Sequence, residues 1–590
     1  MLETKKISCD LCVVGGGLSG MAAAISAARE GLQVVLMHER AVLGGNASSE
    51  IRMWISGARG ESNRETGIIE EIILENHYRN PTKSYAVWDT VLYDFIRREK
   101  NIRLLLNCTC MDCKTETGDF SHGRSIRISS VTGYQMTTQR FFCVEAKFFA
   151  DCSGDSILAP LSGAQYRIGR EAVIENKENT SLAQADKMTM GMSCLIQGRE
   201  TANPIPYIPH TWSSKLQDAD FEDRMPNLYD DAENFWYLEL GGNRDSIGDT
   251  EEIRDELLEL ATGTWDYIKR NPKFGAQNWD LDFLGFLPGK RESRRMVGEY
   301  TLTQRDISDG TVFRDEIAFG GWPLDDHFPG GFYHKGTPNT DIATPAPYSI
   351  PYRTLYSANV DNLFFAGRNI SVTHFALSSV RVMATCALLG EAVGKAAFLA
   401  ATKDCTPHDV YLTHLETLQQ LLLNADCFLP SKRRYVSQVC AAANLQGADN
   451  NIRNGIDREH PIYPKTPVLL CEPGDEIRYT FPAAAVESIH IVFDSDLNRK
   501  TLPGSWVEQG RCMRSNQRLD QPQTALPLTL CKEFELSGYL QGEKQFCIHV
   551  EENRKRAYHI AANQRFDSLV LKPLQSWGSG PIPIISFDFQ

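Results

Sequence analysis

The clearest hydrophobic and polar pattern lies in the first forty residues of the chain. Leu11–Val14 is a short apolar run, the next six residues include four glycines, Met21–Glu30 is rich in alanine, and Leu32–Met37 is apolar again. Short apolar runs on either side of a glycine turn and an alanine-rich segment predict strand, turn, helix and strand. The chain is therefore predicted to begin with a βαβ unit.

Helical and extended patterns continue to alternate after this unit. The sequence predicts a helix over 87–100, a strand over 102–106, hairpin strands over 125–139 and a strand over 141–151. Such alternation favours a layered α/β domain. An apolar run at 362–366 and a long helix over 377–401 belong to the same domain, so we expect that domain to be discontinuous.

Two other regions have different patterns. Residues 164–344 are rich in polar and aromatic residues without βαβ repeats, and residues 465–590 hold short alternating runs between proline and glycine turns, as in an antiparallel β-sandwich. The predicted fold is α/β in five parts: a Rossmann-like domain split over 1–165 and 346–405, an inserted substrate or cap domain (166–345), a helical connector (406–460) and a C-terminal antiparallel β-sandwich (461–590).

Composition and charge exclude several classes of protein. The 590 residues are 42% hydrophobic and 23% charged, which excludes a disordered or collagen-like chain. The net charge of −14 argues against nucleic acid as a partner, because phosphate binding needs a positive field.

The richest apolar stretch, 380–401, contains three charged residues, so we expect a buried helix and no membrane span. No secretory signal is evident, and the 16 scattered cysteines fit reduced thiols, so we predict a cytoplasmic location.

Two groups of cysteines raise the question of metal or redox chemistry. Cys9 and Cys12 form CxxC at the start of a strand, where residues three apart point to opposite faces. Cys108, Cys110 and Cys113 form CxCxxC without a convincing fourth ligand. We interpret both groups as strand residues and predict no metal site, with metal or redox chemistry as the alternative.

The glycine turn has the spacing of a dinucleotide site. Gly15, Gly17 and Gly20 satisfy GxGxxG between a strand and a helix, and Leu18 and Ser19 lie between them. The glycines permit a tight turn and let backbone N–H groups approach a pyrophosphate at the positive end of the helix. Glu39 ends the second strand 19 residues after Gly20, where a carboxylate accepts hydrogen bonds from a ribose hydroxyl.

Several motifs resemble FAD proteins of the glutathione-reductase and fumarate-reductase type. They are Glu39-Arg40 with Gly44-Gly45-Asn46, then Asp151 to Gly154, and the strand ending in Gly367-Arg368. Residues 44–58, 64–72, 286–300, 350–356 and 366–397 are similar to the family of FAD-dependent oxidoreductases. The resemblance implies a bound FAD contacted by these motif residues. Arg368 stands where that class usually has an acid, so this contact departs from the pattern.

The segment from Ala376 to Val380 opens a helix rich in small residues. A flavin gathers negative charge at N1 and O2 when it is reduced, so it needs N–H donors or a helix N-terminus there. Ser379 and Val380 are candidates for this contact. Gly390 and Gly394 permit the helix to pack closely against the sheet.

Four side chains are candidates for catalysis. His374 closely follows the late glycine turn and could exchange a proton near the flavin. Arg295 belongs to the basic run 290–295, which could bind a carboxylate or phosphate. Arg52 could also lie over the flavin or substrate, and Arg381 lies in an apolar helix, where an unpaired charge is costly. Structural pairing is the alternative for each.

Other residues are candidates for the cap side of the cavity. These are Tyr352-Arg353, the segment Asp325-Asp326-His327, and His334. A metal at the aspartates and histidines fits no recognised spacing. The sequence shows no second GxGxxG at a strand–helix junction, so we expect electrons to pass directly between substrate and flavin N5, with an unidentified second electron acceptor.

The sequence favours an FAD-dependent oxidoreductase that transfers a hydride between a small molecule and flavin N5. The C-terminal part resembles galactose-binding-like modules, which implies a carbohydrate or another polyhydroxylated substrate. Two alternatives remain: fumarate-reductase-like reduction of an unsaturated carboxylic acid, and a binding or assembly protein with a structural FAD. A tRNA-modifying flavoprotein is disfavoured by the acidic balance. The oligomeric state, a homo-oligomer included, stays open.

Overall fold

The computed structural model describes residues 2–179, 182–230, 233–459, 462, 468–503 and 513–590. Its first sheet has seven strands in these residues, in the order β3-β2-β1-β6-β5-β4, with β16 also on β6. Five strands are parallel: β1 (Thr4–Val14), β2 (Val34–Met37), β3 (Ile102–Leu105), β6 (Arg140–Asp151) and β16 (Leu363–Phe365). β4 (Cys108–Thr117) and β5 (Ile126–Gln135) are antiparallel.

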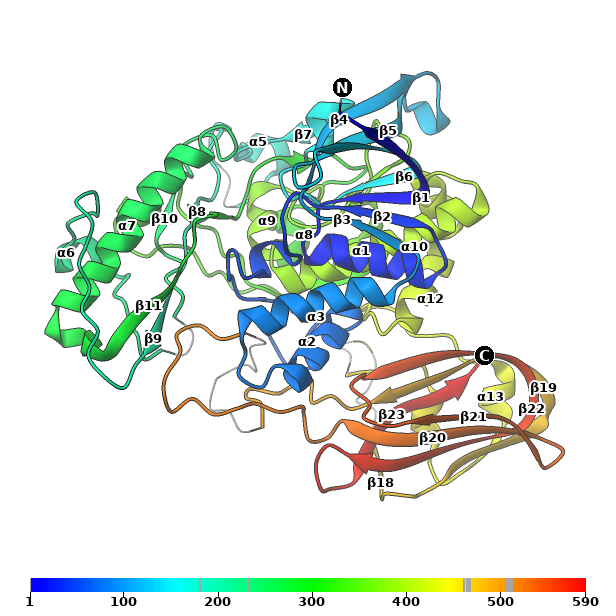
Figure 1. The fold of residues 1–590 in the computed structure, drawn as a ribbon. Helices are drawn as coiled ribbons and strands as arrows, with labels where there is room; N and C mark the ends of the chain where they lie inside the picture. Colours follow the sequence, from blue (N-terminus) through cyan, green and yellow to red (C-terminus); the bar gives the residue numbers. More distant parts are fainter. Residues whose placement is uncertain (1, 180–181, 231–232, 460–461, 463–467, 504–512) are drawn as a thin grey trace.

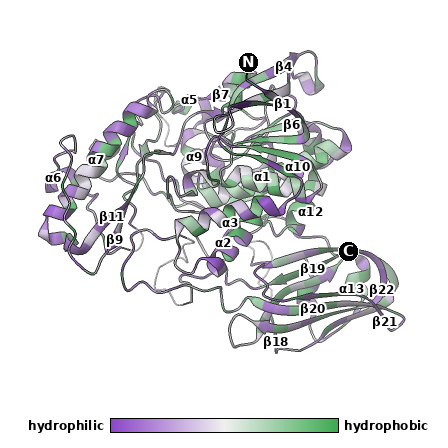
Figure 2. Ribbon diagram, viewed as in Figure 1, coloured by the Kyte–Doolittle hydropathy of each residue, from purple (hydrophilic) through white to green (hydrophobic). Residues whose placement is uncertain are grey.

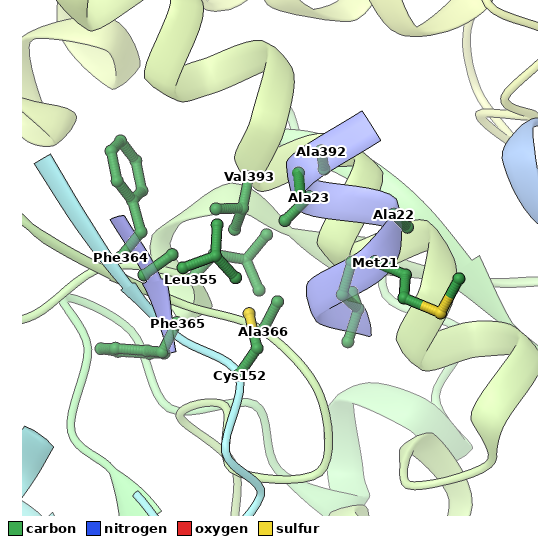
Figure 3. Packing of buried hydrophobic residues seen from close by; sticks show 14 of the residues in the cluster. Met21, Ala22, Ala23, Cys152, Leu355, Phe364, Phe365, Ala366, Ala392 and Val393 are labelled. Carbon is green, nitrogen blue, oxygen red and sulfur yellow. The ribbon is translucent and has the colours of Figure 1, made fainter. Parts of the chain in front are cut away.

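Helices pack beside this sheet, as Figure 1 shows. They are α1 (Leu18–Arg29), α2 (Ile68–Arg79), α3 (Tyr85–Arg98), α9 (His374–Val380) and α10 (Met383–Lys403). α1 and α10 meet closely, because a Cβ on Gly390 would lie 1.9 Å from the Ser19 carbonyl oxygen. The small residues of α10 therefore serve its packing against α1, and Figure 3 shows Ala22, Ala23, Ala392 and Val393 at this contact.

Three predictions of local structure need correction. The predicted helix over 377–401 is two helices, because the N–H of Ala384 donates to the carbonyl of Ser56 and Val382 is extended. Residues 125–139 hold one strand, β5, rather than a complete hairpin. Within 465–590, where short alternating runs were expected, residues 477–493 form one long strand of 17 residues, β19. The predicted α/β class and βαβ unit are confirmed.

The insertion between the two parts of this domain contains one long helix, α7 (Thr250–Arg270), whose apolar residues lie in a core of their own. Its other helices are α5 (Val173–Asn176), α6 (Asp218–Phe221) and α8 (Gln304–Ser308). Its strands are β7 (Tyr166–Arg167), β8 (Met192–Ser193), β9 (Ile196–Glu200), β10 (Glu239–Leu240), β11 (Trp279–Leu284), β12 (Gly289–Lys290), β13 (Arg295–Met296) and β14 (Glu316–Gly320). The flanking parts of the first domain add α4 (Leu158–Ser162) before it and β15 (Tyr348–Pro351) after it.

The C-terminal part follows α11 (Pro407–Thr413), α12 (Leu415–Asn424) and α13 (Gln438–Ala442). Within the described residues it has one seven-stranded antiparallel sheet: β17 (Asn444–Gln446), β18 (Leu469–Cys471), β19 (Ile477–Phe493), β20 (Cys531–Leu540), β21 (Glu543–Val550), β22 (Ala557–Ser576) and β23 (Ile582–Phe589). Antiparallel strands were predicted here and are confirmed; the division into two sandwich layers stays a prediction.

A long connection between β19 and β20 leaves the C-terminal sheet and crosses the other two domains. We call two described parts of this connection, residues 495–503 and 513–519, the strap. Figure 1 shows it passing below α2 and α3 toward β9. The N–H of Gln517 donates to Gly198, and Glu200 donates back to Gln517. The strap thus connects all three parts of the molecule.

Hydropathy follows this organisation. In Figure 2 the central strands and α10 are hydrophobic, whereas α7 carries one hydrophilic side. α10 is long and apolar enough to cross a membrane, but 89% of its apolar window is buried inside the protein. The prediction of a buried helix is therefore confirmed.

Candidate active site

A cavity of about 1260 Å³ lies at the carboxyl ends of the parallel strands, bounded by the first domain, the insertion and the strap. Its walls include the residues that follow β1, β2, β6 and β16. The carboxyl edge of a parallel sheet is where α/β proteins bind ligands. The volume exceeds the roughly 300–1,000 Å³ usual for small-molecule pockets, so the cavity has room for a large ligand and a second molecule.

The glycine turn forms one end of the cavity. Gly15, Gly17, Leu18 and Ser19 line it, and Gly17 is the N-cap of α1 without a side-chain cap. The first N–H groups of an uncapped helix lack partners and attract an anion. Gly20 does not line the cavity; a Cβ there would lie 1.8 Å from the Gly15 carbonyl oxygen, so Gly20 lets the turn close.

The end of β2 adds charged groups to the same wall. Glu39 and Arg40 line the cavity, together with Gly44, Gly45 and Asn46. Burial favours a higher pKa for Glu39, but the hydrogen bond and charge of His38 lower it to about 2. Glu39 is therefore ionised at neutral pH. Nη1 of Arg40 is buried without a hydrogen-bond partner in the described structure.

Gly154 and Gly367-Arg368, which were predicted to contact the cofactor, also line the cavity. Arg368 Nη2 donates to Asp155 over 2.6 Å, and Lys290 Nζ donates to Asp155 over 2.9 Å. Burial opposes ionisation of Asp155, but these two cations lower its pKa to about 2. Asp155 therefore pairs with two cations whose residues line the cavity, and it is not itself among the lining residues.

Several predicted cofactor residues lie behind the cavity wall. Asp151 accepts hydrogen bonds from Ser153 and from the N–H of Leu158, so it shapes the turn. Ser379 donates to the carbonyl of Trp322, and Val380 is buried beside it. Neither lines the cavity. Instead, the break between α9 and α10 brings Arg381, Val382, Met383 and Ala384 to the wall, so the N-terminus of α10 faces the cavity.

Arg52 lies away from the cavity. Its guanidinium stacks on Phe283 at 4.0 Å and on Tyr85 at 4.7 Å, and it donates to Gln197 over 2.8 Å. Arg52 therefore joins the first domain to the insertion. This contact is the structural alternative expected for it.

One group of residues in the cavity wall combines tryptophan rings with charged side chains; we call the part that they line the chamber. Trp236, Trp322, Asp325, His327 and Arg381 line it. His327 Nδ1 lies 2.6 Å from Glu239 Oε2, and its Nε2 lies 3.4 Å from Asp325 Oδ1. Arg381 Nη2 donates to the carbonyl of Asp325 over 2.9 Å, while its Nε is buried without a hydrogen-bond partner in the described residues.

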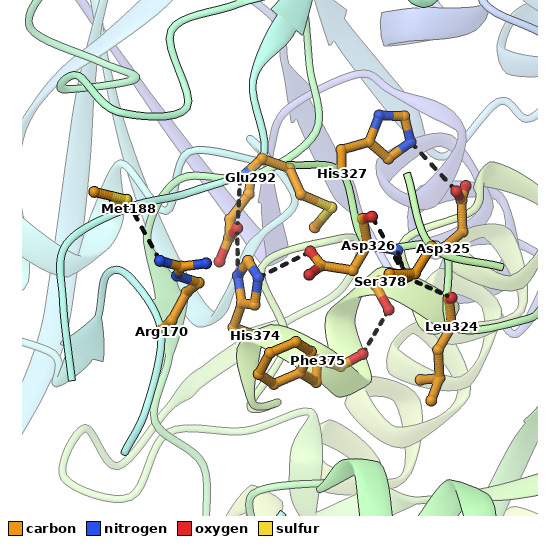
Figure 4. Close-up of polar contacts among 12 residues, drawn as sticks. Arg170, Met188, Glu292, Leu324, Asp325, Asp326, His327, His374, Phe375 and Ser378 are labelled. Carbon is orange, nitrogen blue, oxygen red and sulfur yellow. Dashed lines mark hydrogen bonds and ion pairs between the residues drawn. The ribbon is translucent and has the colours of Figure 1, made fainter. Parts of the chain in front are cut away.

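His374 and Arg295 lie behind the chamber rather than in it. His374 is 1% exposed, and both ring nitrogens are engaged: Nδ1 lies 2.8 Å from Glu292 and Nε2 lies 3.0 Å from Asp326. Arg295 is fully buried and pairs with Glu171 at 3.0 Å. Figure 4 shows His374 between Glu292 and Asp326.

The cap candidates divide in the same way. Asp325 and His327 line the cavity, whereas Asp326, His334, Tyr352 and Arg353 do not.

The sequence analysis missed several residues that line the cavity: Trp54, Trp236, Trp322 and the strap residues Leu497 to Lys500. Tryptophans between polar residues were a usable signal. The strap had none, because its position depends on contacts far apart in the sequence.

Both cysteine groups lie on strands: Cys9 and Cys12 on β1, and Cys108, Cys110 and Cys113 on β4. Burial raises the pKa of Cys9 and Cys108 to about 12, so these thiols are neutral at neutral pH. Among the described residues, the group that could hold a metal ion is Glu533, His549 and Glu551, on the C-terminal sheet.

The lining residues fit an extended dinucleotide. An uncapped helix N-terminus, a carboxylate at the end of β2, and two buried guanidinium nitrogens without a hydrogen-bond partner among the described residues, Nη1 of Arg40 and Nε of Arg368, belong to residues that line one cavity. A pyrophosphate, a ribose and further acceptor groups would satisfy these donors and acceptors. The fold and the cavity define a dinucleotide-binding protein.

Comparison with known proteins specifies the dinucleotide. The family model for FAD dependent oxidoreductases matches residues 10–422, and the chain belongs to this family. The protein is therefore an FAD-dependent oxidoreductase, as predicted from its motifs.

Individual relatives are distant. The 4-oxocyclohex-2-ene-1-carboxylate 5-dehydrogenase of Sinomonas cyclohexanicum is 34% identical over 110 residues, which cover 18% of this chain and 19% of that protein. A geranylgeranyl bacteriochlorophyll reductase-like protein from Thermoplasma acidophilum is 11% identical over 71% of this chain and 86% of that one, with a TM-score of 0.32. The E. coli quinol fumarate reductase FrdA is 12% identical over 71% of this chain and 75% of that one, with a TM-score of 0.28.

Proposed function

We propose that this enzyme oxidises an alcohol group of a polyhydroxylated small molecule, with His327 accepting the hydroxyl proton. When bound, FAD supplies the acceptor for the hydride at flavin N5. The observation that carries the proposal is the position of His327: it lines the same cavity as the glycine turn, and its partners hold the ring. The proposal replaces His374 as the acid–base group.

The cofactor contacts follow from the cavity wall. The N–H groups at the start of α1 would hold the pyrophosphate, and Glu39 would accept from the ribose. The N-terminus of α10 would face the flavin and favour the negative charge that gathers on its reduction. The sequence analysis gave this role to Ser379 and Val380. We now propose Met383 and Ala384, which begin α10 and line the cavity.

The hydrogen bonds of His327 support a role as general base. In the neutral tautomer that donates from Nδ1 to Glu239, the ring carries an electron pair on Nε2, and this atom would have to exchange its 3.4 Å contact with Asp325 Oδ1 for the substrate hydroxyl. Nε2 would remove the proton of the hydroxyl group while the hydrogen on the same carbon leaves as a hydride. The alcohol thus loses one proton and one hydride, which carries the two electrons, and becomes a carbonyl. Glu239 balances the positive charge that the ring acquires.

The other chamber residues favour a polyhydroxylated substrate. Trp236 and Trp322 offer flat apolar rings, and Asp325 and Arg381 offer an acceptor and donors in the same chamber. Asn339, also in the cavity wall, adds an amide. A few polar groups among aromatic side chains orient a small molecule and give specificity. The C-terminal resemblance to galactose-binding-like modules points to the same class of substrate.

The test is anaerobic reduction of the purified holoenzyme, followed by the absorbance of its flavin. We expect sugars or other polyols to bleach the flavin, His327→Gln to slow bleaching by roughly 10²–10⁴-fold, and FAD content to stay unchanged. His210→Gln, at an exposed position of the insertion, is the matched control and should bleach like the wild type. Bleaching by polyols that survives His327→Gln would contradict the proposed base.

A second candidate is reduction of an unsaturated carboxylic acid. It is favoured by Arg381, whose buried Nε has no partner in the described residues and could bind a carboxylate, and by the carboxylate in the name of the Sinomonas relative. It predicts that enoates, and not sugars, exchange electrons with the flavin after dithionite reduction. Tight FAD without any electron exchange would instead favour a structural cofactor.

A further inference from the structure

Five charged side chains form a buried chain behind the chamber. In order they are Glu171, Arg295, Glu292, His374 and Asp326, and none has a side chain more than 10% exposed. Glu171 lies 3.0 Å from Arg295, which lies 3.4 Å from Glu292. The chain contains three carboxylates and one guanidinium, so a positive charge on His374 offsets one of the two acids that Arg295 leaves unbalanced.

His374 is held as a cation at the centre of this chain. Burial would lower its pKa, but the charges of Glu292 and Asp326 raise the pKa to about 10. Its backbone N–H also donates to Glu171 over 2.9 Å. Because both ring nitrogens donate to carboxylates, neither is available to a substrate. Any effect of His374 on the chamber must pass through its partners.

Asp326 connects this chain to the chamber. Residues 324–327 are extended and pair with the segment 339–342, through Leu324 with Ile342 and His327 with Asn339. Successive side chains of an extended segment point to opposite sides. Asp325 and His327 accordingly line the cavity, whereas Asp326 turns back to His374, as Figure 4 shows.

We propose that His374 is a positioning residue: by holding Asp326 from behind, it fixes the extended segment so that Asp325 and His327 face the chamber. The inference deepens the proposed function and rests on it for the role of His327. The anchor is strong because each of its ion pairs is buried, where removal of one partner leaves an uncompensated charge. A base must be held in place, since a displacement of about 1 Å can cost roughly a hundredfold in rate.

Two variants test the anchor. Asp326→Asn keeps the shape of the side chain and leaves His374 paired with Glu292; His374→Gln removes the cation. The matched control is Glu175→Gln, which removes an ion pair with Arg167 at the surface of the insertion. The first readout is hydrogen exchange over residues 322–328 in the holoenzyme, measured by mass spectrometry. We expect faster exchange there in Asp326→Asn, with FAD content unchanged.

The second readout is stopped-flow flavin reduction by a substrate that bleaches the wild type. We expect the limiting rate to fall by roughly tenfold to a hundredfold while the apparent substrate Kd changes little, because His327 moves and the binding groups remain. Unchanged exchange, or an unchanged limiting rate, in Asp326→Asn would overturn the inference even if His374→Gln fails to fold. If no substrate reduces the wild type, the proposed function fails and hydrogen exchange alone decides: faster exchange supports the anchor, and unchanged exchange overturns it.

Discussion

Gly17 and Gly20 belong to one turn but are constrained by different neighbours. A Cβ on Gly20 would meet the Gly15 carbonyl oxygen at 1.8 Å, whereas a Cβ on Gly17 would meet nothing of the protein closer than 3.9 Å. Gly17 also has φ −67°, which any residue can adopt. At the residue scale, Gly20 therefore serves the fold and Gly17 serves the approach of the cofactor.

This difference gives the first prediction. Gly20→Ala should lower the Tm of the FAD-free protein, because overpacking against backbone costs about 1–3 kcal/mol. Gly17→Ala should leave that Tm unchanged and weaken FAD binding by about tenfold or more, equal to about 1.4 kcal/mol. Thermal unfolding of the apoprotein and fluorescence titration with FAD measure the two effects. Wild-type FAD affinity in Gly17→Ala would show that the pyrophosphate does not approach this residue.

At the scale of elements, α10 meets the start of α2 through one buried carboxyl group. Glu391 on α10 is 2% exposed and accepts the N–H of Ile68 over 3.0 Å. Burial raises the pKa of Glu391 from 4.5 to about 7, against the opposing effects of this hydrogen bond and of Lys395. The folded protein thus holds the proton more tightly than the unfolded chain does.

The pH dependence of stability follows from that shift. The contribution of Glu391 is most favourable below about pH 4.5 and falls as the pH rises to about 7, where the folded group also ionises. Glu391→Gln keeps an oxygen for Ile68 and removes the charge. We expect its stability relative to the wild type to increase between pH 5 and pH 8 by up to about 3 kcal/mol.

Denaturant unfolding at the two pH values measures this change. Glu259→Gln, on the exposed side of α7, is the control and should show little difference between the two pH values. A Glu391→Gln variant whose stability tracks that of the wild type at both pH values would mean that the buried group is already neutral, or that its charge is compensated.

At the scale of the whole molecule, the strap joins the C-terminal sheet to the cavity. Arg499 in the strap makes two hydrogen bonds of 3.0 Å to Glu70 on α2, and both side chains are 1% exposed. Asn498, beside it, donates to Ser62 over 3.2 Å, and residues 497–500 line the cavity. The segment that leaves the C-terminal sheet therefore forms part of the cavity wall.

The third prediction concerns this ion pair. Arg499→Met alone should destabilise the protein by about 3–5 kcal/mol, because it leaves Glu70 buried without its partner. Combining it with Glu70→Gln should restore part of that loss, so the two effects should not add. A double-mutant cycle by denaturant unfolding measures the coupling, and limited proteolysis reports whether the strap is released. Additive effects would contradict a direct pairing.

The sequence predicted the parts of the site that depend on neighbouring residues. The glycine turn, Glu39 and Gly367-Arg368 lie at the ends of strands, and strand ends can be read from short patterns of apolar residues and glycine. Cofactor and fold class follow from them. The long helix over 377–401 was predicted as continuous because nothing local marks its break; the carbonyl of Ser56, far away in the chain, replaces a helical acceptor.

By itself, the sequence determined the class of this protein: a Rossmann-type FAD domain with an insertion and an antiparallel C-terminal region. The tertiary structure decided which charged residues face the cavity. Three residues were candidates by type and position but have partners that folding alone brings close. His374 and Arg295 pair with acids, and Arg52 contacts the amide of Gln197 and the ring of Phe283. The physical reason is that a buried charge must find a partner, and the partner is set by the packing of distant segments rather than by sequence spacing.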